Sequence, residues 1–185
     1  NATVAVGGDV LLNAGALCLY AGGTNGTALS CGAALTLTNG AGQSTTVRSV
    51  LVAANGDVWA ATDLPSRLHL LKDGKLQALA LPVGARSIRA LTEGVDGTIW
   101  AGTSDGQLLR ISGTTLISEP AVHEARRMSI RSLHVTPDGC LWIGYAGWGL
   151  GLLWQGQYAR LTMDDGLHDD YISQIQSDGH GSMWF

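Results

Sequence analysis

Four tryptophans recur along the chain at a nearly constant interval, and few architectures accommodate such a repeat. The intervals are 41, 42 and 42 residues, and a glycine lies three positions before each tryptophan. A segment of alternating apolar and polar residues, such as 47–50, precedes each pair with the same spacing. Three landmarks with one period indicate a structural repeat of about 42 residues. The repeated tryptophans are Trp59, Trp100, Trp142 and Trp184.

Each repeat contains the signals of four short strands joined by tight turns. The first strand alternates apolar and polar residues, and the second carries the tryptophan. Asn55-Gly56 and Asp96-Gly97 lie between these two strands, and such pairs supply the positive φ that a hairpin turn needs. No repeat contains a run of about ten residues with helical spacing. Four antiparallel strands in about 42 residues match one blade of a β-propeller.

The predicted fold is therefore all-β, a propeller of four-stranded blades of which the chain holds about 4.5. The first blade is divergent, with Tyr20 in place of tryptophan and a third strand expected to end at Leu29–Gly32. The sequence stops at Met183–Phe185, within the second strand of a repeat, and propellers close with about 4–8 blades. We therefore expect a fragment of a larger propeller of about seven blades, with an unusual five-bladed closure as the alternative. The predicted blades are 8–42, 43–84, 85–124, 125–167 and the incomplete 168–185.

The chain has three cysteines, Cys18, Cys31 and Cys140. In the alignment of the first blade, Cys18 lies on the second strand and Cys31 at the end of the third. A Cys18–Cys31 disulfide is therefore conceivable, and isolated thiols are the alternative. No histidine combines with these cysteines at a zinc-binding spacing, so no metal site is predicted from them.

Charge and motif content exclude several classes of function. The chain has 11 basic and 15 acidic residues and a net charge of −4, so it lacks the basic surface that binds nucleic acid or an anionic membrane. No stretch approaches the ~20 apolar residues of a membrane span. Neither a GxSxG nor an HExxH motif occurs. We therefore predict a binding protein, not an enzyme, with no cofactor.

Two segments of the repeat carry a family resemblance. Asp96–Thr103, which reads DGTIWAGT, resembles the D-G-x-ϕ-W-ϕ-G-T core of the two-component regulator propeller repeat, and Asp138–Gly144 is similar. Asp164–Ile172 resembles the linker between blades of that family. The resemblance covers residues 47–185 well and residues 1–46 poorly.

The resemblance implies the sensor part of a bacterial two-component-type receptor, located in the periplasm. Such receptors are homodimers that bind small polar ligands or carbohydrates, and a membrane helix connects them to a histidine kinase or a cyclic-di-GMP-producing domain. Any membrane contact or catalysis would then belong to segments outside this chain. A propeller lyase of the streptogramin type, which has a similar core, and a passive protein-interaction propeller remain as alternatives.

Candidate ligand-binding residues gather on one predicted face. In a propeller, the linkers before the innermost strands lie on the same face as the loops between second and third strands, and loops on a rigid scaffold commonly carry recognition. Three arginines recur on the innermost strands, where they either face a ligand or pair with acidic neighbours. The predicted ligand-binding residues are Arg48, Arg89, Arg131, Asp105, Tyr145, Trp148, His168, Asp169 and Tyr171.

The aromatic and acidic residues have structural as well as functional interpretations. The repeated tryptophans, at one position of every blade, are expected to pack between sheets as structural core. Trp148 breaks the repeat and is the better candidate for stacking on a ligand. The acidic linker forms either a calcium site or a solvated loop. Its carboxylates belong to Asp164, Asp165, Asp169 and Asp170.

Overall fold

The computed structural model describes most of the chain beyond residue 45 and three short strands before it. The described residues are 10–13, 16–19, 33–36, 46–63, 65–73, 75–122, 128–178 and 180–185. The chain divides into two compact units, Asn1–Leu79 and Ala80–Phe185. Among the described residues, no helix is long and apolar enough to cross a membrane.

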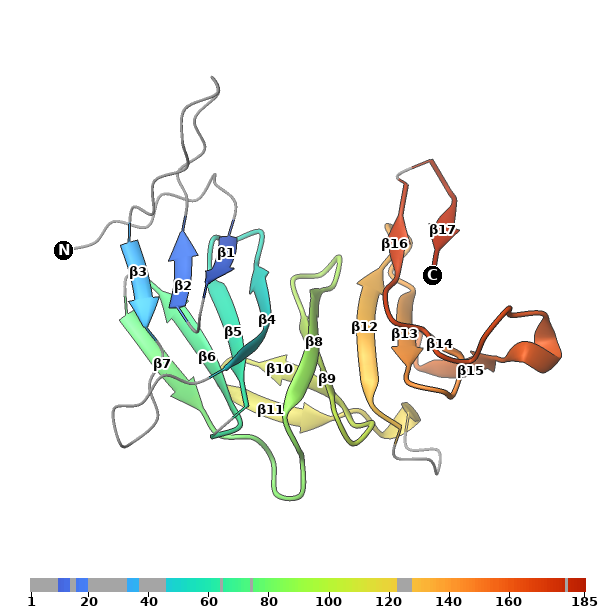
Figure 1. Cartoon of the computed structure of the whole chain (residues 1–185), viewed down its shortest axis with the longest axis horizontal. Coiled ribbons are helices and arrows are strands. Elements are labelled where there is room, and N and C mark those ends of the chain that lie inside the picture. Colours follow the sequence, from blue (N-terminus) through green and yellow to red (C-terminus); the bar gives the residue numbers. More distant parts are fainter. Residues whose placement is uncertain are drawn as a thin grey trace. The chain divides into compact units, whose positions relative to one another are not determined.

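Each complete blade is an antiparallel sheet whose four strands are hydrogen-bonded in chain order (Figure 1). The first unit holds one such sheet and the second holds two, which confirms the all-β fold predicted from the repeat. The sheet of the first unit consists of β4 (Val47–Val52), β5 (Val58–Thr62), β6 (Arg67–Lys72) and β7 (Lys75–Leu79). The second unit begins with β8 (Ile88–Glu93), β9 (Ile99–Thr103), β10 (Leu108–Ser112), β11 (Thr115–Ser118) and the 3₁₀ turn η1 (Pro120–Val122). It continues with β12 (Ile130–Val135), β13 (Leu141–Tyr145), β14 (Leu150–Trp154), β15 (Gln157–Leu161) and η2 (Met163–Asp165).

Two smaller sheets lie toward the ends of the chain. The first consists of β1 (Val10–Asn13), β2 (Ala16–Leu19) and β3 (Ala33–Thr36). The second pairs β16 (Gln176–Ser177) with β17 (Met183–Trp184).

The divergent first blade differs from its predicted alignment. The strand that pairs with β2 is β3, in which Ala34 lies opposite Cys18. The third strand of this blade is therefore the apolar segment Ala33–Thr36. The alignment had instead placed the third strand in the segment that ends at Gly32. The proposed Cys18–Cys31 disulfide lies outside the described residues, as does Tyr20.

A side-chain oxygen closes the turn between the first two strands of each blade from β4 onward. Asn55, Asp96 and Asp138 each accept a hydrogen bond through Oδ1 from the backbone N–H two residues later, at 3.0–3.4 Å. Asp178 accepts one from the N–H of His180 at 2.7 Å. These Asx turns explain why acidic or amide residues recur before the turn glycines, which have φ near 80° at Gly97 and Gly139.

The core of the second unit lies between neighbouring sheets. Leu108, Ile130 and Ile143 are almost completely buried in it, and Trp100 packs against it. The repeated tryptophans are not buried equally. Trp59 is buried, Trp100 and Trp142 are half-buried, and Trp184 is 67 % exposed, unlike the expected core residue. The described part of the sheet that contains Trp184 has two strands.

Glycines on the second strands allow successive blades of the second unit to approach closely. A Cβ on Gly102 would collide with the Ile130 side chain of the next sheet. A Cβ on Gly144 would lie 2.8 Å from Cγ2 of Ile172 and would also meet the Ser132 hydroxyl. The glycine two positions after the tryptophan therefore serves the packing between blades, since its missing side chain leaves room for a buried isoleucine.

We predict that Gly102→Ala destabilises the protein by about 2–3 kcal/mol, because the added methyl group overpacks the contact with Ile130. The measurement is the free energy of unfolding in urea. Gly113→Ala is the control, because a Cβ there would meet nothing within 4 Å. Its cost should be about 1 kcal/mol, from the positive φ alone. Equal costs for the two variants would show that packing at Gly102 is not limiting.

Candidate functional site

Backbone hydrogen bonds tie each linker between blades to a loop at the end of the second strand. The N–H of Asp63 donates to the carbonyl of Thr46 at 3.1 Å. In the second unit, Ser104 donates in the same way to Ser87 at 2.8 Å, and Ala146 donates to Ser129 at 2.9 Å. Linkers and loops between the second and third strands therefore share one face of each blade, as predicted. We call this the linker face.

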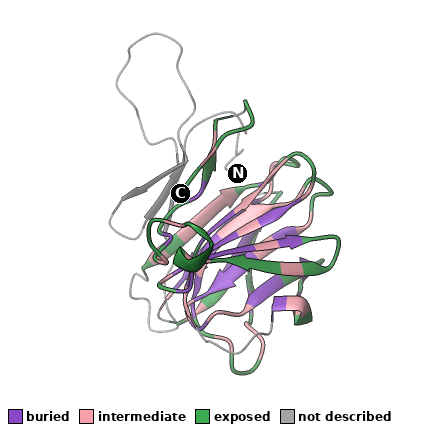
Figure 2. Cartoon of the chain, turned by 90° about the vertical axis from the view of Figure 1, so that its right-hand side faces the viewer, coloured by how far each residue is buried: buried purple, intermediate pink, exposed green. Residues whose placement is uncertain are grey.

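The last linker, residues 162–172, is fixed to the β13–β14 loop in the same manner. The N–H of Gly149 donates to the Asp170 carbonyl, and the N–H of Ile172 donates to the Tyr145 carbonyl, both at 2.8 Å. Tyr171 and Ala146 form an isolated antiparallel bridge. The η2 turn itself is exposed to solvent (Figure 2).

Most of the acidic side chains of this linker hold its own backbone. Asp165 accepts hydrogen bonds from the N–H and the hydroxyl of Thr162 at 3.0 and 3.1 Å. Asp170 accepts one from the N–H of Met163, and Asp169 one from that of Tyr171, both at 2.9 Å. Within the described ranges, no three His, Cys, Asp or Glu side chains are grouped as metal ligands. Three of the four linker carboxylates thus act in loop structure.

Asp105, predicted to bind ligand, is instead buried in a hydrogen-bond network with its Oδ atoms occupied. It accepts from the Thr103 hydroxyl at 2.7 Å, from the Gln107 amide at 3.0 Å and from the N–H of Arg86 at 3.2 Å. Burial alone would raise the pKa of Asp105, but these three donors together lower it below the usual value. Its ionised carboxylate therefore fastens the linker before β8 to the β9–β10 loop and is not available to a ligand.

Tyr145 and Trp148, also predicted to bind ligand, lie in the core. Tyr145 is fully buried, and Trp148 is 8 % exposed. Their rings meet edge to face, with centroids 5.2 Å apart. Burial raises the pKa of the Tyr145 phenol, which accepts a hydrogen bond from Tyr158 at 3.1 Å. Trp148 therefore stabilises its loop, and its aromatic face is not open for stacking.

An arginine that the sequence did not single out covers this tryptophan. The Arg160 guanidinium lies 4.5 Å from the centroid of the Trp148 ring and donates to the Trp148 carbonyl at 3.4 Å. Arg160 comes from β15, where it lies opposite Gly151 of β14. The space left by the missing side chain of Gly151 is filled by the rings of Tyr158 and Tyr145, so the sequence contained no signal for Arg160.

The three recurring arginines have different environments. Arg48, in the first unit, forms an ion pair of 2.7 Å with Asp63 of its own blade. Arg89 is half-buried. Arg131 is exposed, and its guanidinium carbon lies 5.9 Å from the centroid of the Tyr171 ring. Among the described residues Arg131 forms no ion pair, whereas Arg48, which is also exposed, is engaged by Asp63.

Four of the predicted binding residues thus remain accessible on the linker face of the second unit. His168 and Asp169 are exposed, and Tyr171 is 49 % exposed beside Arg131. A planar cation beside an exposed aromatic ring can bind a carboxylate through two parallel hydrogen bonds while the ring contacts an apolar surface. The exposed set is Arg131, His168, Asp169 and Tyr171.

Solved structures show that this fold is a part of a β-propeller. The chain is similar to the extracellular domain of a hybrid two-component system of B. thetaiotaomicron, with a TM-score of 0.68 and 21 % identity. The match covers 95 % of the chain and 25 % of that domain. A second such domain from this organism matches with a TM-score of 0.67, 22 % identity and the same coverage of both chains. The chain thus spans a quarter of the length of these domains.

An enzyme with a propeller is also similar. Virginiamycin B lyase from Staphylococcus aureus matches with a TM-score of 0.65 and 16 % identity, over 80 % of this chain and 48 % of the lyase. No family model matches the chain, and no curated protein matches its sequence. At these identities the likeness establishes the fold and leaves the function open.

We predict that Thr103→Val lowers the free energy of unfolding by about 2 kcal/mol, because the loss of the hydroxyl removes a donor to Asp105 and an acceptor of the Gln107 N–H. Urea titration measures the change. Thr115→Val, at an exposed position of β11, is the matched control and should be nearly neutral. A Thr103 variant as stable as this control would contradict the network's role.

We also predict that Asp105 makes the free energy of unfolding depend on pH. Because its pKa is lower in the folded than in the unfolded protein, its contribution to stability is present above the unfolded pKa and is lost as the pH falls through the folded one. Between about pH 5 and pH 2, Asp105→Asn should therefore lose stability less steeply than the wild type. Asp164→Asn, an exposed change on η2, should follow the wild-type slope. Parallel slopes for all three proteins would refute the prediction.

Proposed function

We propose that this chain belongs to the ligand-binding sensor propeller of a bacterial two-component-type receptor and acts in the periplasm. The ligand is a small polar molecule or an oligosaccharide bound on the linker face. The chain itself performs no catalysis. Signalling would follow from a change in packing between propellers or protomers that an output domain detects.

The structural likeness supports a sensor over the alternatives. The extracellular two-component domains align with 95 % of the chain, whereas the lyase aligns with 80 % of it. The repeat core at Asp96–Thr103 and the linker at 164–172 resemble the same class of receptor. These observations support the class of protein, whereas the exposed residues indicate which ligand it binds.

The single observation that carries the ligand site is the exposed pair of Arg131 and Tyr171 on a rigid linker. Backbone hydrogen bonds hold Asp170 and Ile172 in place on either side of Tyr171, so the pair is presented by a fixed scaffold. A guanidinium recognises carboxylate groups, and an adjacent aromatic ring suits the apolar face of a sugar. We therefore expect acidic saccharides to bind more tightly than neutral ones.

The histidines in the described part of the chain do not favour a lyase. His69 is buried, and burial followed by the charge of Arg67 lowers its pKa. His134 is half-buried, and desolvation lowers its pKa. His168 and His180 are exposed on a linker and a turn. Among the described residues these histidines come from separate elements, and none is grouped with two other potential metal ligands.

We predict that a panel of uronic-acid and neutral oligosaccharides contains at least one ligand, found by thermal shift and measured by calorimetry. Arg131→Gln and Tyr171→Leu should each weaken its affinity about tenfold or more, because they remove the charge and the ring. Arg110→Gln removes an exposed charge from β10 and should leave the affinity unchanged.

Two results would contradict this proposal. The first is equal affinity of the wild type and both linker-face variants for every saccharide that binds. The second is metal-dependent turnover of a streptogramin such as quinupristin that is lost on His134→Ala or His168→Ala, which would establish the lyase instead.

The sequence encoded on either side of the chain gives a further check, with more 42-residue repeats, a membrane helix and an output domain expected.

A further inference from the structure

The second unit contains a cavity between two of its sheets that the proposed sensor site does not use. Its volume is about 250 Å³, and it lies between the sheets β8–β11 and β12–β15. The turns at Gly94–Asp96, Gly139 and Gln155–Gly156 line it. These turns lie at the ends of the strands remote from the β13–β14 loop, whereas Glu119, which also lines the cavity, follows the end of β11 and donates its N–H to the carbonyl of Leu108 at the start of β10.

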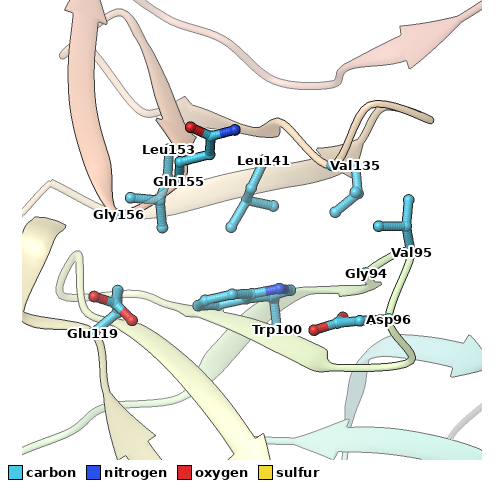
Figure 3. A pocket seen from close by; sticks show the side chains of 11 residues that line it. Gly94, Val95, Asp96, Trp100, Glu119, Val135, Leu141, Leu153, Gln155 and Gly156 are labelled. Carbon is cyan, nitrogen blue, oxygen red and sulfur yellow. The ribbon is translucent and has the colours of Figure 1, made fainter.

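The walls of this cavity are apolar and aromatic. Figure 3 shows the Trp100 indole on one side, with Leu141 and Leu153 across from it. Trp100 is half-buried, so it packs against the core and also borders the cavity. The volume is slightly below the ~300 Å³ at which ligand pockets commonly begin, which suits a small molecule and not an oligosaccharide.

The charges that line the cavity are all negative. Asp96 and Glu119 lie beyond the two ends of the indole in Figure 3, and no basic residue contributes to the lining. Hydrogen bonds from the N–H and then the hydroxyl of Thr98 lower the pKa of Asp96, with a smaller effect of Arg110. Glu119 accepts one hydrogen bond through Oε1, from the N–H of Ala121 at 3.3 Å. Both carboxylates thus add negative potential beside the aromatic ring, and Arg110, which lies opposite Trp100 on β10 outside the lining, offsets part of it at Asp96.

We infer that this cavity binds a small organic cation, an ammonium group attached to an aromatic or short aliphatic body. The body lies between the Trp100 indole and the two leucines, where it replaces water on apolar surface. The ammonium group lies beyond an end of the indole, within reach of Glu119 or Asp96, where the carboxylate attracts the cation. Anions of the same shape are repelled by the same charges, so the site selects by charge as well as by size.

The test uses the full chain and three probes of similar shape: 2-phenylethylammonium, 2-phenylethanol and phenylacetate. Calorimetry at low ionic strength should show that the ammonium binds about tenfold more tightly than the alcohol, with no binding of the anion. Glu119→Gln and Asp96→Asn should weaken ammonium binding, about tenfold for the stronger of the two effects. Both substitutions keep the side-chain shape and one acceptor oxygen, so the turns they stabilise should remain folded.

Asp164→Asn removes the same charge from the linker face and serves as the control, with unchanged affinity expected. Circular dichroism and thermal unfolding verify that each variant is folded. The inference is overturned if the wild type binds none of the probes or binds the alcohol as tightly as the ammonium. It is also overturned if neither Glu119→Gln nor Asp96→Asn weakens ammonium binding. Because the saccharide experiment uses Arg131 and Tyr171, either proposal can fail without the other.

Discussion

The close approach of neighbouring blades in the second unit is the constraint on which the rest of its structure depends. Gly102 and Gly144 leave the space that Ile130 and Ile172 of the following segments fill. With blades this close, each linker reaches the loop at the end of the preceding second strand and pairs with its backbone. The packing of one small residue against one isoleucine thus sets the position of the linker face.

In this arrangement, many of the polar and aromatic groups that recognition sites commonly use are buried or hydrogen-bonded within the protein. The Asp105 carboxylate accepts hydrogen bonds from three donors, and the rings of Tyr145 and Trp148 are buried against each other. Their role is to make the loops rigid, which lowers the conformational entropy that a bound ligand would have to restrict. What remains accessible, Arg131 beside Tyr171, is small but presented on a fixed backbone.

The two ends of the strands in the second unit differ in charge and shape. The linker face exposes the Arg131 guanidinium beside an aromatic ring, whereas the turn that contains Asp96, at the other strand ends, borders an apolar cavity. The difference arises from the turns. An aspartate that closes an Asx turn satisfies the backbone locally, yet its negative charge still acts on its surroundings. Turn chemistry required for folding therefore also shapes the electrostatics of one face.

The sequence by itself determined the repeat, the positions of the strands from β4 onward and the turns between them. These features follow from local rules: alternation with period two, and glycines, aspartates and asparagines at turns. Only the tertiary structure decided which side chains reach solvent. Trp148 lies in a loop that the sequence marked as exposed, but Arg160, twelve residues later, covers its ring. Trp59 and Trp100 occupy the same position of the repeat, and yet the first is buried while the second is half-buried and borders a cavity. The periodicity of a strand is a property of its own backbone, whereas burial depends on neighbouring strands that are remote in sequence.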